Sequence, residues 1–338
     1  SPNRSFFSTL VIPAEGYVLH FADEFDDHHN GKPNPQHWDY KTGSVINDEQ
    51  QCYTDDHPSY VDAGISNVAV ETRQLDGQDN GVLVLSLKKE TVSCIQAGGD
   101  TFHYTSGAVS TRMDDAGAPY LVDMPHGMYE IRAKIPPGRG TWPAIWLLGK
   151  KDYTPDDPVT IGWPDAGEID IMEAVGFEEA NGLYRLHHTL HRNRDGGFLW
   201  PHRRPNRTGQ GMTVSLNEPP SARFHVYRMI WTPGSIEFFV DDQRVRTMDL
   251  GDGVTGERDG FFRNAPDMNG WGHPNTTADD HLGWPYAMEA GNRFKLIMNL
   301  AWGGGWGGQQ GLDNSIFNND QAVEMLVDYV RVYVPAAD

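Results

Sequence analysis

The stretch GWPDAGEIDIMEAVG, Gly162–Gly176, carries three acids set among apolar residues. Glu168 and Asp170 are two residues apart, so on a β-strand their side chains point to the same face. Glu173 lies at an odd offset from Glu168, so a regular strand would turn it to the opposite face. One extra residue in a β-bulge brings it back. The stretch therefore predicts a bulged strand with three carboxylates on one face.

Three acids on one face of a sheet repel one another, so their arrangement indicates a use. Two close carboxylates whose pKa values are driven apart are the equipment for cleaving a glycosidic bond. The alternative is an acidic, solvated face opposite an apolar core face. Ile169, Ile171 and Met172 alternate with the acids, and glycines bound the stretch, which favours a strand over a helix.

Tryptophans surround the acids in the sequence. Trp142 and Trp146 lie in TWPAIWLLGK, Thr141–Lys150, and Trp163 comes shortly before the acids. Aromatic rings supply the flat apolar area on which the C–H faces of sugars pack. A single tryptophan would be interpreted as a core residue, whereas a cluster around three acids favours a carbohydrate site.

A series of motifs, in order, resembles glycoside hydrolase family 16, and within it the laminarinase-type branch with its E-x-D-x-x-E strand. The resemblance runs from FADEFD, Phe21–Asp26, to Val334. The motifs between them are NDEQQCYT (Asn47–Thr54), YTSG (Tyr104–Gly107), HGMYEIRAKIPPGRGTWPAIW (His126–Trp146), GEIDIMEAVG (Gly167–Gly176), FHVYRMIWTPGSIEFFVDD (Phe224–Asp242), FKLIMNLAWGG (Phe294–Gly304) and VDYVRVYV. The resemblance implies a retaining glycoside hydrolase.

The resemblance also implies roles for individual residues. Glu168 aligns with the nucleophile, Glu173 with the general acid/base, and Asp170 with the assisting acid between them. Retention through a covalent intermediate needs the two carboxyl groups about 5–5.5 Å apart, which one bulged strand can provide. The substrate-binding residues expected around these acids are Asn47, Trp142, Trp146, Trp163, His191, Trp302 and Trp306.

The expected function is endo-acting hydrolysis of internal β-linkages in β-1,3- or mixed β-1,3/1,4-glucan. One departure weakens the inference to glucan, because Ala108 stands where many laminarinase-type members have an arginine after YTSG. The long stretch Asp252–Ala287 is also unusual. The alternative substrates are β-galactoside-containing glycans, such as galactan, agar, carrageenan or mucin chains. A non-catalytic glycan-binding module ranks lower, because all three acids are present.

The chain as a whole is typical of an all-β protein. Strand candidates recur from end to end: Val82–Lys89, Met128–Ile135, His225–Thr232, Ile236–Val240, Phe294–Asn299 and Val327–Val334. Convincing helices are few, and Asn34–Trp38 and Asp320–Met325 read as short turns. The pattern predicts a sandwich of two curved antiparallel sheets. The resemblance specifies a β-jelly roll with a concave substrate cleft, as a single catalytic domain over residues 1–338 with residues 1–15 as an N-terminal extension.

The net charge of −20 argues against nucleic acid as a partner, since nucleic-acid-binding proteins present basic surfaces. The sequence contains no apolar stretch of membrane-spanning length, so we expect no membrane insertion. An enzyme that cuts a polymer meets its substrate outside the cell, which predicts a secreted or cell-surface protein, extracellular or periplasmic. We expect a monomer.

Two further sites stay open at the level of sequence. Cys52 and Cys94 could form one disulfide or remain buried thiols. Catalysis by paired carboxylates needs no cofactor. The resemblance implies a structural calcium ion held by Glu24 and Asp328 near the two ends of the domain, and the alternative is two ordinary surface acids.

Overall fold

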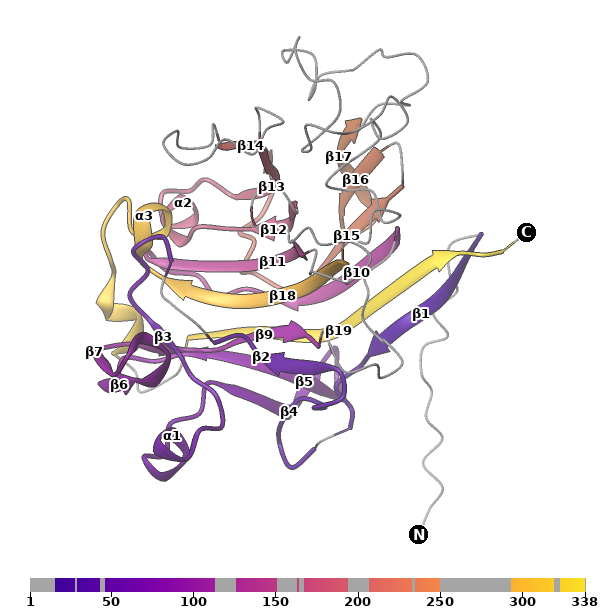
Figure 1. Cartoon of the computed structure of the whole chain (residues 1–338). Helices are drawn as coiled ribbons and strands as arrows, with labels where there is room; N and C mark the ends of the chain where they lie inside the picture. The colour runs from indigo at the N-terminus through magenta and orange to yellow at the C-terminus, as the bar shows by residue number, and fades with distance from the viewer. Residues whose placement is uncertain are drawn as a thin grey trace.

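Two antiparallel sheets packed against each other make up the protein (Figure 1). The computed structural model describes residues 16–27, 29–42, 46–112, 126–150, 163, 167–193, 207–232, 235–249, 293–318 and 323–337. The expected extension 1–15 and the stretch Asp252–Ala287 lie outside these residues. Within them, no helix is long and apolar enough to cross a membrane.

The first sheet has eight strands in the described part of the chain. Its order is β17 (Gln243–Asp249), β16 (Ser235–Val240), β15 (His225–Trp231), β10 (Gly127–Lys134), β19 (Val323–Pro335), β5 (Gln78–Leu87) and β4 (Val68–Leu75), while β1 (Tyr17–Asp23) pairs with β19. The pairing of β1 with β19 joins the beginning of the described chain to its end.

The second sheet has seven strands and carries the three acids. Its order is β14 (Arg207–Ser215), β13 (Arg185–Asn193), β12 (Glu168–Glu173), β11 (Thr141–Lys150), β18 (Arg293–Trp302), β9 (Ala108–Thr111) and β2 (Trp38–Tyr40). β12 and β11 lie near the middle of the sheet, so residues on these strands have neighbours on both sides.

The core lies between the two sheets and follows from the alternation along their strands. On β10, Tyr129, Ile131 and Ala133 point into the core, while the charged residues between them face outward. On β11, Ile145 and Leu147 are fully buried in the same core. The opposite face of the seven-stranded sheet, which we call the cleft face, therefore receives the residues between, Trp142 and Trp146 among them.

Short strands and short helices lie along one edge of the sandwich. β3 (Cys52–Tyr53) pairs in parallel with β8 (Thr105–Ser106), and β6 (Val92–Cys94) pairs with β7 (Asp100–Phe102). The short helices are α1 (Pro58–Asp62), α2 (Gly176–Ala180) and α3 (Gly304–Gly307), with single 3₁₀ turns at Ile95–Ala97 and Asn314–Phe317.

The fold agrees with the all-β jelly-roll prediction, and each predicted strand overlaps an observed one, although three of them were predicted one or two residues too long at the C-terminal end. One detail was wrong: Val323–Met325, expected within a short turn, begins strand β19. Their side chains pair with β5 and alternate in and out of the core, and this sheet pairing overrides the local preference.

Candidate active site

The predicted bulge is present in β12. Asp170 pairs with Thr189 on β13, whereas Glu173 pairs with His187, so one strand advances three residues while its partner advances two. The extra residue leaves Ile171 and Met172 both buried in the core. Glu173 thereby returns to the cleft face beside the other two acids.

The three acids are buried to an extent that favours their neutral forms. Asp170 is only 3% exposed, and burial raises its pKa well above the usual range. Burial and the charge of Asp170 raise the pKa of Glu168 well above its usual range. Burial and the charge of Asp170 also raise the pKa of Glu173, to about 8. Glu173 can therefore hold a proton at neutral pH.

His191 contacts two of the three acids. Its Nε2 lies 3.4 Å from Glu168 Oε1 and 3.0 Å from Asp170 Oδ2. A cationic imidazole in these contacts would favour the ionised forms of Glu168 and Asp170, as does the hydrogen bond from the Trp163 side chain to Glu168. The charge of His191 and the hydrogen bond from the Trp142 indole, 3.0 Å from Glu173 Oε1, also lower the pKa of Glu173, but burial outweighs them.

The same groups could also be considered as a metal site. One ligand atom each from Glu168, Asp170 and His191 lies within 4.8 Å of the others. A metal ion there would occupy two of the three carboxylates, so it would compete with their use in hydrolysis.

A wall of rings stands on one side of Glu173. Trp142 contacts Trp306 edge-on, with ring centroids 5.3 Å apart, and Trp306 contacts His187 at 4.8 Å. Glu178 holds the His187 ring through Nε2 at 2.8 Å. Glu178 comes from α2, whose first residue is Gly176, where an added Cβ would lie 1.7 Å from Gly138 O. Only glycine lets this helix approach so closely.

A second group of rings stands on the other side, toward β9 and β2. The Trp146 indole donates to Asn299 Oδ1 at 2.7 Å, and Asn299 Nδ2 donates to the Tyr53 hydroxyl at 3.1 Å.

Asn47, also expected to bind substrate, is exposed with a positive φ of 56°, and its carbonyl accepts from Gly305 beside α3. The structure thus gathers six of the seven predicted binding residues around the acids: Asn47, Trp142, Trp146, Trp163, His191 and Trp306.

Trp302, the seventh, was predicted wrongly. Its side chain is fully buried and packs in the core against Tyr104 and Phe317. Side chains alternate between the two faces of a strand, so on β18 Trp302 shares its face with Leu300, which also points into the core. Trp306 lies beyond the strand end, on α3, and so escapes this constraint.

The predicted calcium ligands do not fit a shared ion as the structure arranges them. Both oxygens of Glu24 accept hydrogen bonds from Arg331 at 2.7 Å. Asp328 accepts from Arg132 at 2.6 Å and from Asn80 at 3.5 Å. Calcium needs six to eight oxygen ligands, and guanidinium groups already neutralise these two. Calcium at this place stays an untested prediction, and the ion pairs argue against it.

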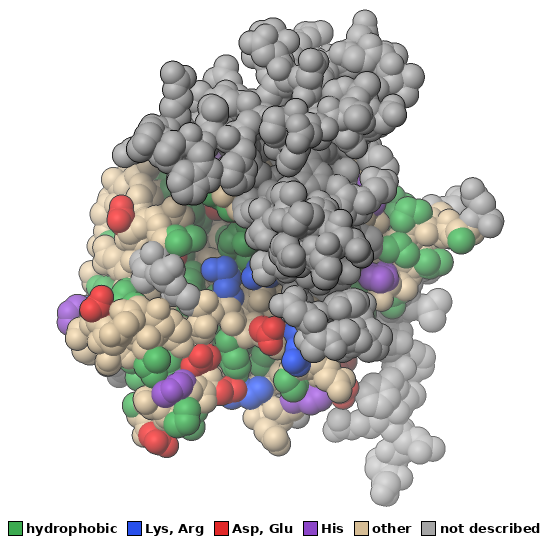
Figure 2. Space-filling view, in the orientation of Figure 1, with side chains coloured by type: hydrophobic (Ala, Val, Ile, Leu, Met, Phe, Trp, Pro, Cys, Tyr) green, Lys and Arg blue, Asp and Glu red, His purple; other side chains and the backbone are tan. Residues whose placement is uncertain are grey.

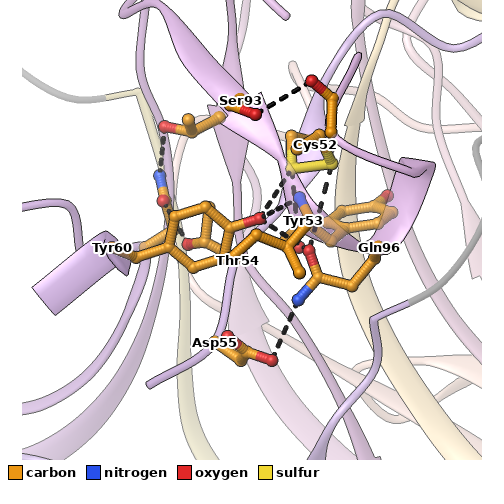
Figure 3. The surroundings of a disulfide bond; sticks show 12 residues. Cys52, Tyr53, Thr54, Asp55, Tyr60, Ser93 and Gln96 are labelled. Carbon is orange, nitrogen blue, oxygen red and sulfur yellow. Dashed lines mark hydrogen bonds between the residues drawn. A yellow bond between two sulfur atoms is a disulfide. The ribbon is translucent and has the colours of Figure 1, made fainter. Parts of the chain in front are cut away.

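Cys52 and Cys94 form a disulfide between β3 and β6, with Cα atoms 5.8 Å apart (Figure 3). The Tyr60 hydroxyl beside it donates to Gln96 Oε1 at 2.7 Å and accepts from the Ile95 N–H at 2.9 Å. The residue after Cys52 is Tyr53, whose hydroxyl bonds Asn299 on the cleft face. The disulfide therefore anchors the segment that carries this side of the site.

Several residues of the site escaped sequence reasoning: Lys41, Glu49, Tyr53, Glu178, His187 and Asn299. His187 had a usable signal, because it is four residues from His191 and so shares its face on β13. The intervening His188 is buried in the core, where burial lowers its pKa to about 4. The others reach the site from separate strands and loops; Glu49, Tyr53 and Asn299 lie within motifs of the resemblance, but their spacing does not mark them as site residues.

Comparisons with known proteins agree with this geometry. The family model described as "Glycosyl hydrolases family 16" matches residues 122–264. A β-glucanase of Rhodothermus marinus is 34% identical over 95% of this chain and 86% of its own length. The crystal structure of the laminarinase from Rhodothermus marinus superposes with a TM-score of 0.62 at 32% identity, covering 95% of this chain and 98% of that one. A keratan-sulfate endo-1,4-β-galactosidase of Sphingobacterium multivorum is 28% identical over 98% of this chain and 58% of its own length.

Proposed function

The chain belongs to family 16 of the glycosyl hydrolases, and on this premise we propose that it is a retaining endo-β-glycanase acting on β-1,3- or mixed β-1,3/1,4-glucan. The observation that carries the proposal is the bulge in β12, which brings Glu173 to the face of Glu168 and Asp170. The similarity to a β-glucanase and to a laminarinase over most of the chain supports glucan as the substrate.

The proposed reaction has two steps. Glu168 attacks the anomeric carbon while Glu173 donates its proton to the glycosidic oxygen, so the bond to the leaving sugar breaks as the bond to Glu168 forms. Glu173, now ionised, takes a proton from water, whose oxygen attacks the same carbon and releases Glu168. Two displacements at one carbon retain its configuration.

The neighbours of the acids suit this division of labour. Burial keeps a proton on Glu173 at neutral pH, as its first task requires. His191 and Trp163 favour an ionised Glu168, as nucleophilic attack requires. Asp170, between them, raises the pKa of both glutamates and couples their titrations.

A β-galactoside-containing glycan is the second candidate substrate. It is favoured by the similarity to a keratan-sulfate endo-1,4-β-galactosidase and by Ala108, which presents only a methyl group on the cleft face. The same acids would serve either substrate. A non-catalytic glycan-binding module is less well supported, because the acids are present and their pKa values are perturbed.

Product analysis by mass spectrometry tests the proposal. The panel contains laminarin, barley mixed-linkage glucan, β-galactans, agar, carrageenan and mucin glycans, with Glu168→Gln as the blank. Oligosaccharide ladders from laminarin or mixed-linkage glucan are expected. Ladders from the galactose-containing glycans alone would overturn the substrate and keep the mechanism, and no product from any glycan would overturn the enzyme.

We also propose that the protein is secreted or exposed at the cell surface and acts as a monomer. A disulfide supports this location, since disulfides persist in oxidising compartments. Cell fractionation tests the location, and size-exclusion chromatography with light scattering tests the oligomeric state.

A further inference from the structure

Lys41 reaches the cleft face from the edge of the seven-stranded sheet. It directly follows β2, and its N–H donates to Ala108 O at 2.9 Å. From Ala108 a single row of paired residues crosses the sheet through Asn299 and Ala144 to Glu173. Lys41 therefore stands at the end of the row that leads to the candidate acid/base.

Two aromatic rings border the Lys41 ammonium. Nζ lies 5.6 Å from the ring centroid of Trp146 and 5.8 Å from that of Tyr53. Asn299 hydrogen-bonds both rings, so they are held in place. Figure 2 shows Lys or Arg side chains among hydrophobic ones in a hollow of the displayed face. The ammonium thus lies beside an aromatic platform on which a sugar could stack.

The charge of Lys41 is not matched by a close partner. Among the described residues, no carboxylate lies within 4.0 Å of its ammonium and no side chain accepts a hydrogen bond from it. Burial lowers its pKa and outweighs the charges of Glu49 and Glu168, which raise it; the charge of Lys295 acts in the same direction as burial. An ammonium has three donors, and leaving them without acceptors in a partly buried place costs free energy. A bound ligand that supplies acceptors would recover that cost.

We propose that Lys41 binds substrate, its ammonium donating hydrogen bonds to hydroxyl groups of the sugar unit that stacks on Trp146. The inference rests on the proposed function and names a further residue of the same site. The neighbouring Ala108 offers no polar group, so Lys41 supplies the donors at this end of the row.

The surroundings favour a neutral sugar over a sulfated or acidic one. Glu49 and Glu168 act on Lys41 electrostatically from the same site, and both would repel an anionic substituent. A hydroxyl group can accept from the ammonium and donate to a carboxylate at once. Glu49 is 8% exposed and is held by Gln51 Nε2 at 2.7 Å, so it is fixed for such a contact.

Binding to an inactive enzyme tests the proposal. Isothermal titration calorimetry on the Glu168→Gln protein measures the affinity for neutral β-1,3-, mixed-linkage and β-galactan oligosaccharides and for a sulfated galactan oligosaccharide. Adding Lys41→Met should weaken binding of the tightest neutral ligand by about tenfold or more, the usual effect of losing a charged hydrogen-bond donor. Lys41→Arg, which keeps the charge and the N–H donors in a different geometry, should bind more tightly than Lys41→Met. Lys134→Met, on the outer face of β10, is the matched control and should bind as the parent does.

The outcomes separate this inference from the proposed function. Binding by the Glu168→Gln parent reports on the substrate class, and the ratio between parent and Lys41→Met, on whichever oligosaccharide binds most tightly, reports on Lys41. A ratio within twofold, with an unchanged melting temperature, overturns the role of Lys41 alone. A large ratio confined to the sulfated oligosaccharide would overturn the assignment to hydroxyl groups.

Discussion

Carboxylates lie on both outer surfaces of the sandwich, but the two surfaces treat them differently. On the outer face of the eight-stranded sheet, three described carboxylates contact a guanidinium: Glu130 with Arg228, Asp328 with Arg132 and Glu24 with Arg331. On the cleft face, Glu168, Asp170 and Glu173 have one imidazole and two indoles as neighbours. Similar residue types, spaced along similar strands, contact guanidinium groups on one surface and an imidazole and two indoles on the other.

The difference shows how the active site lowers the stability of the folded protein. A guanidinium beside a partly buried carboxylate favours the ionised form and makes that acid a structural group. Burial without such a cation favours the neutral form, so Glu173 keeps its proton where it can be donated. Repulsion among the cleft acids must be balanced by stability from the rest of the sandwich.

The largest expected effect of mutating carboxylates on the two surfaces is on activity. Glu168→Gln and Glu173→Gln should each reduce hydrolysis of the best glycan by about 10³-fold or more. Glu130→Gln, the same change on the outer face, should leave the rate within about twofold. Initial rates of reducing-sugar release measure all three.

The two glutamates can then be told apart with an aryl glycoside whose leaving group needs no proton. Glu173→Gln should recover much of its glycosylation rate on that substrate, whereas Glu168→Gln should not. Near-normal activity of either variant on the glycan would show that the acid is not catalytic.

A smaller effect is expected on stability, with opposite signs on the two faces. Because the pKa of Glu173 is raised in the folded protein, its contribution to stability is lost as pH rises from its unfolded value of about 4.5 to about 8. At pH 8, Glu173→Gln should stabilise the protein by about 1–3 kcal/mol, and near pH 4 the difference should vanish. Glu130→Gln, which removes an ion pair, should destabilise it by about 1 kcal/mol.

Denaturant unfolding at pH 4, 6 and 8 measures this contrast. A Glu173→Gln protein that is less stable than the parent at pH 8 would contradict the claim that this carboxyl strains the fold.

The smallest expected effect is on the pH dependence of activity, and it comes from changing one neighbour of Glu173. Hydrolysis requires a protonated Glu173, so kcat/KM should fall as pH rises through about 8. The Trp142 indole donates to Glu173 and lowers its pKa, so Trp142→Phe should move this alkaline limb to higher pH by a fraction of a unit. Trp231→Phe, a core change, serves as the control and should leave the limb in place. A limb that moves to lower pH in Trp142→Phe would contradict the assignment of the proton to Glu173.

The sequence by itself determined the strands and the face of each residue within them. Glu168, Asp170 and Glu173 are near neighbours on one strand, so their spacing alone predicted the bulge that β12 contains. The same alternation, applied to β18, would have placed Trp302 in the core, and applied to β13 it would have found His187. Both errors came from considering Trp302 and His187 one at a time, although the alternation along their own strands was enough to place them.

Only the tertiary structure decided which distant residues meet at the acids and which charges are neutralised. Lys41 and Tyr53 lie far from Asn299 in the chain. Lys41 comes near Asn299 because β2, β9 and β18 are adjacent in one sheet, whereas Tyr53 arrives from β3, which pairs with β8. Arginines from other strands likewise pair with Glu24 and Asp328, where the sequence suggested a metal ion. Strand order and register set these contacts, and they depend on packing across the whole sandwich, which no local spacing encodes.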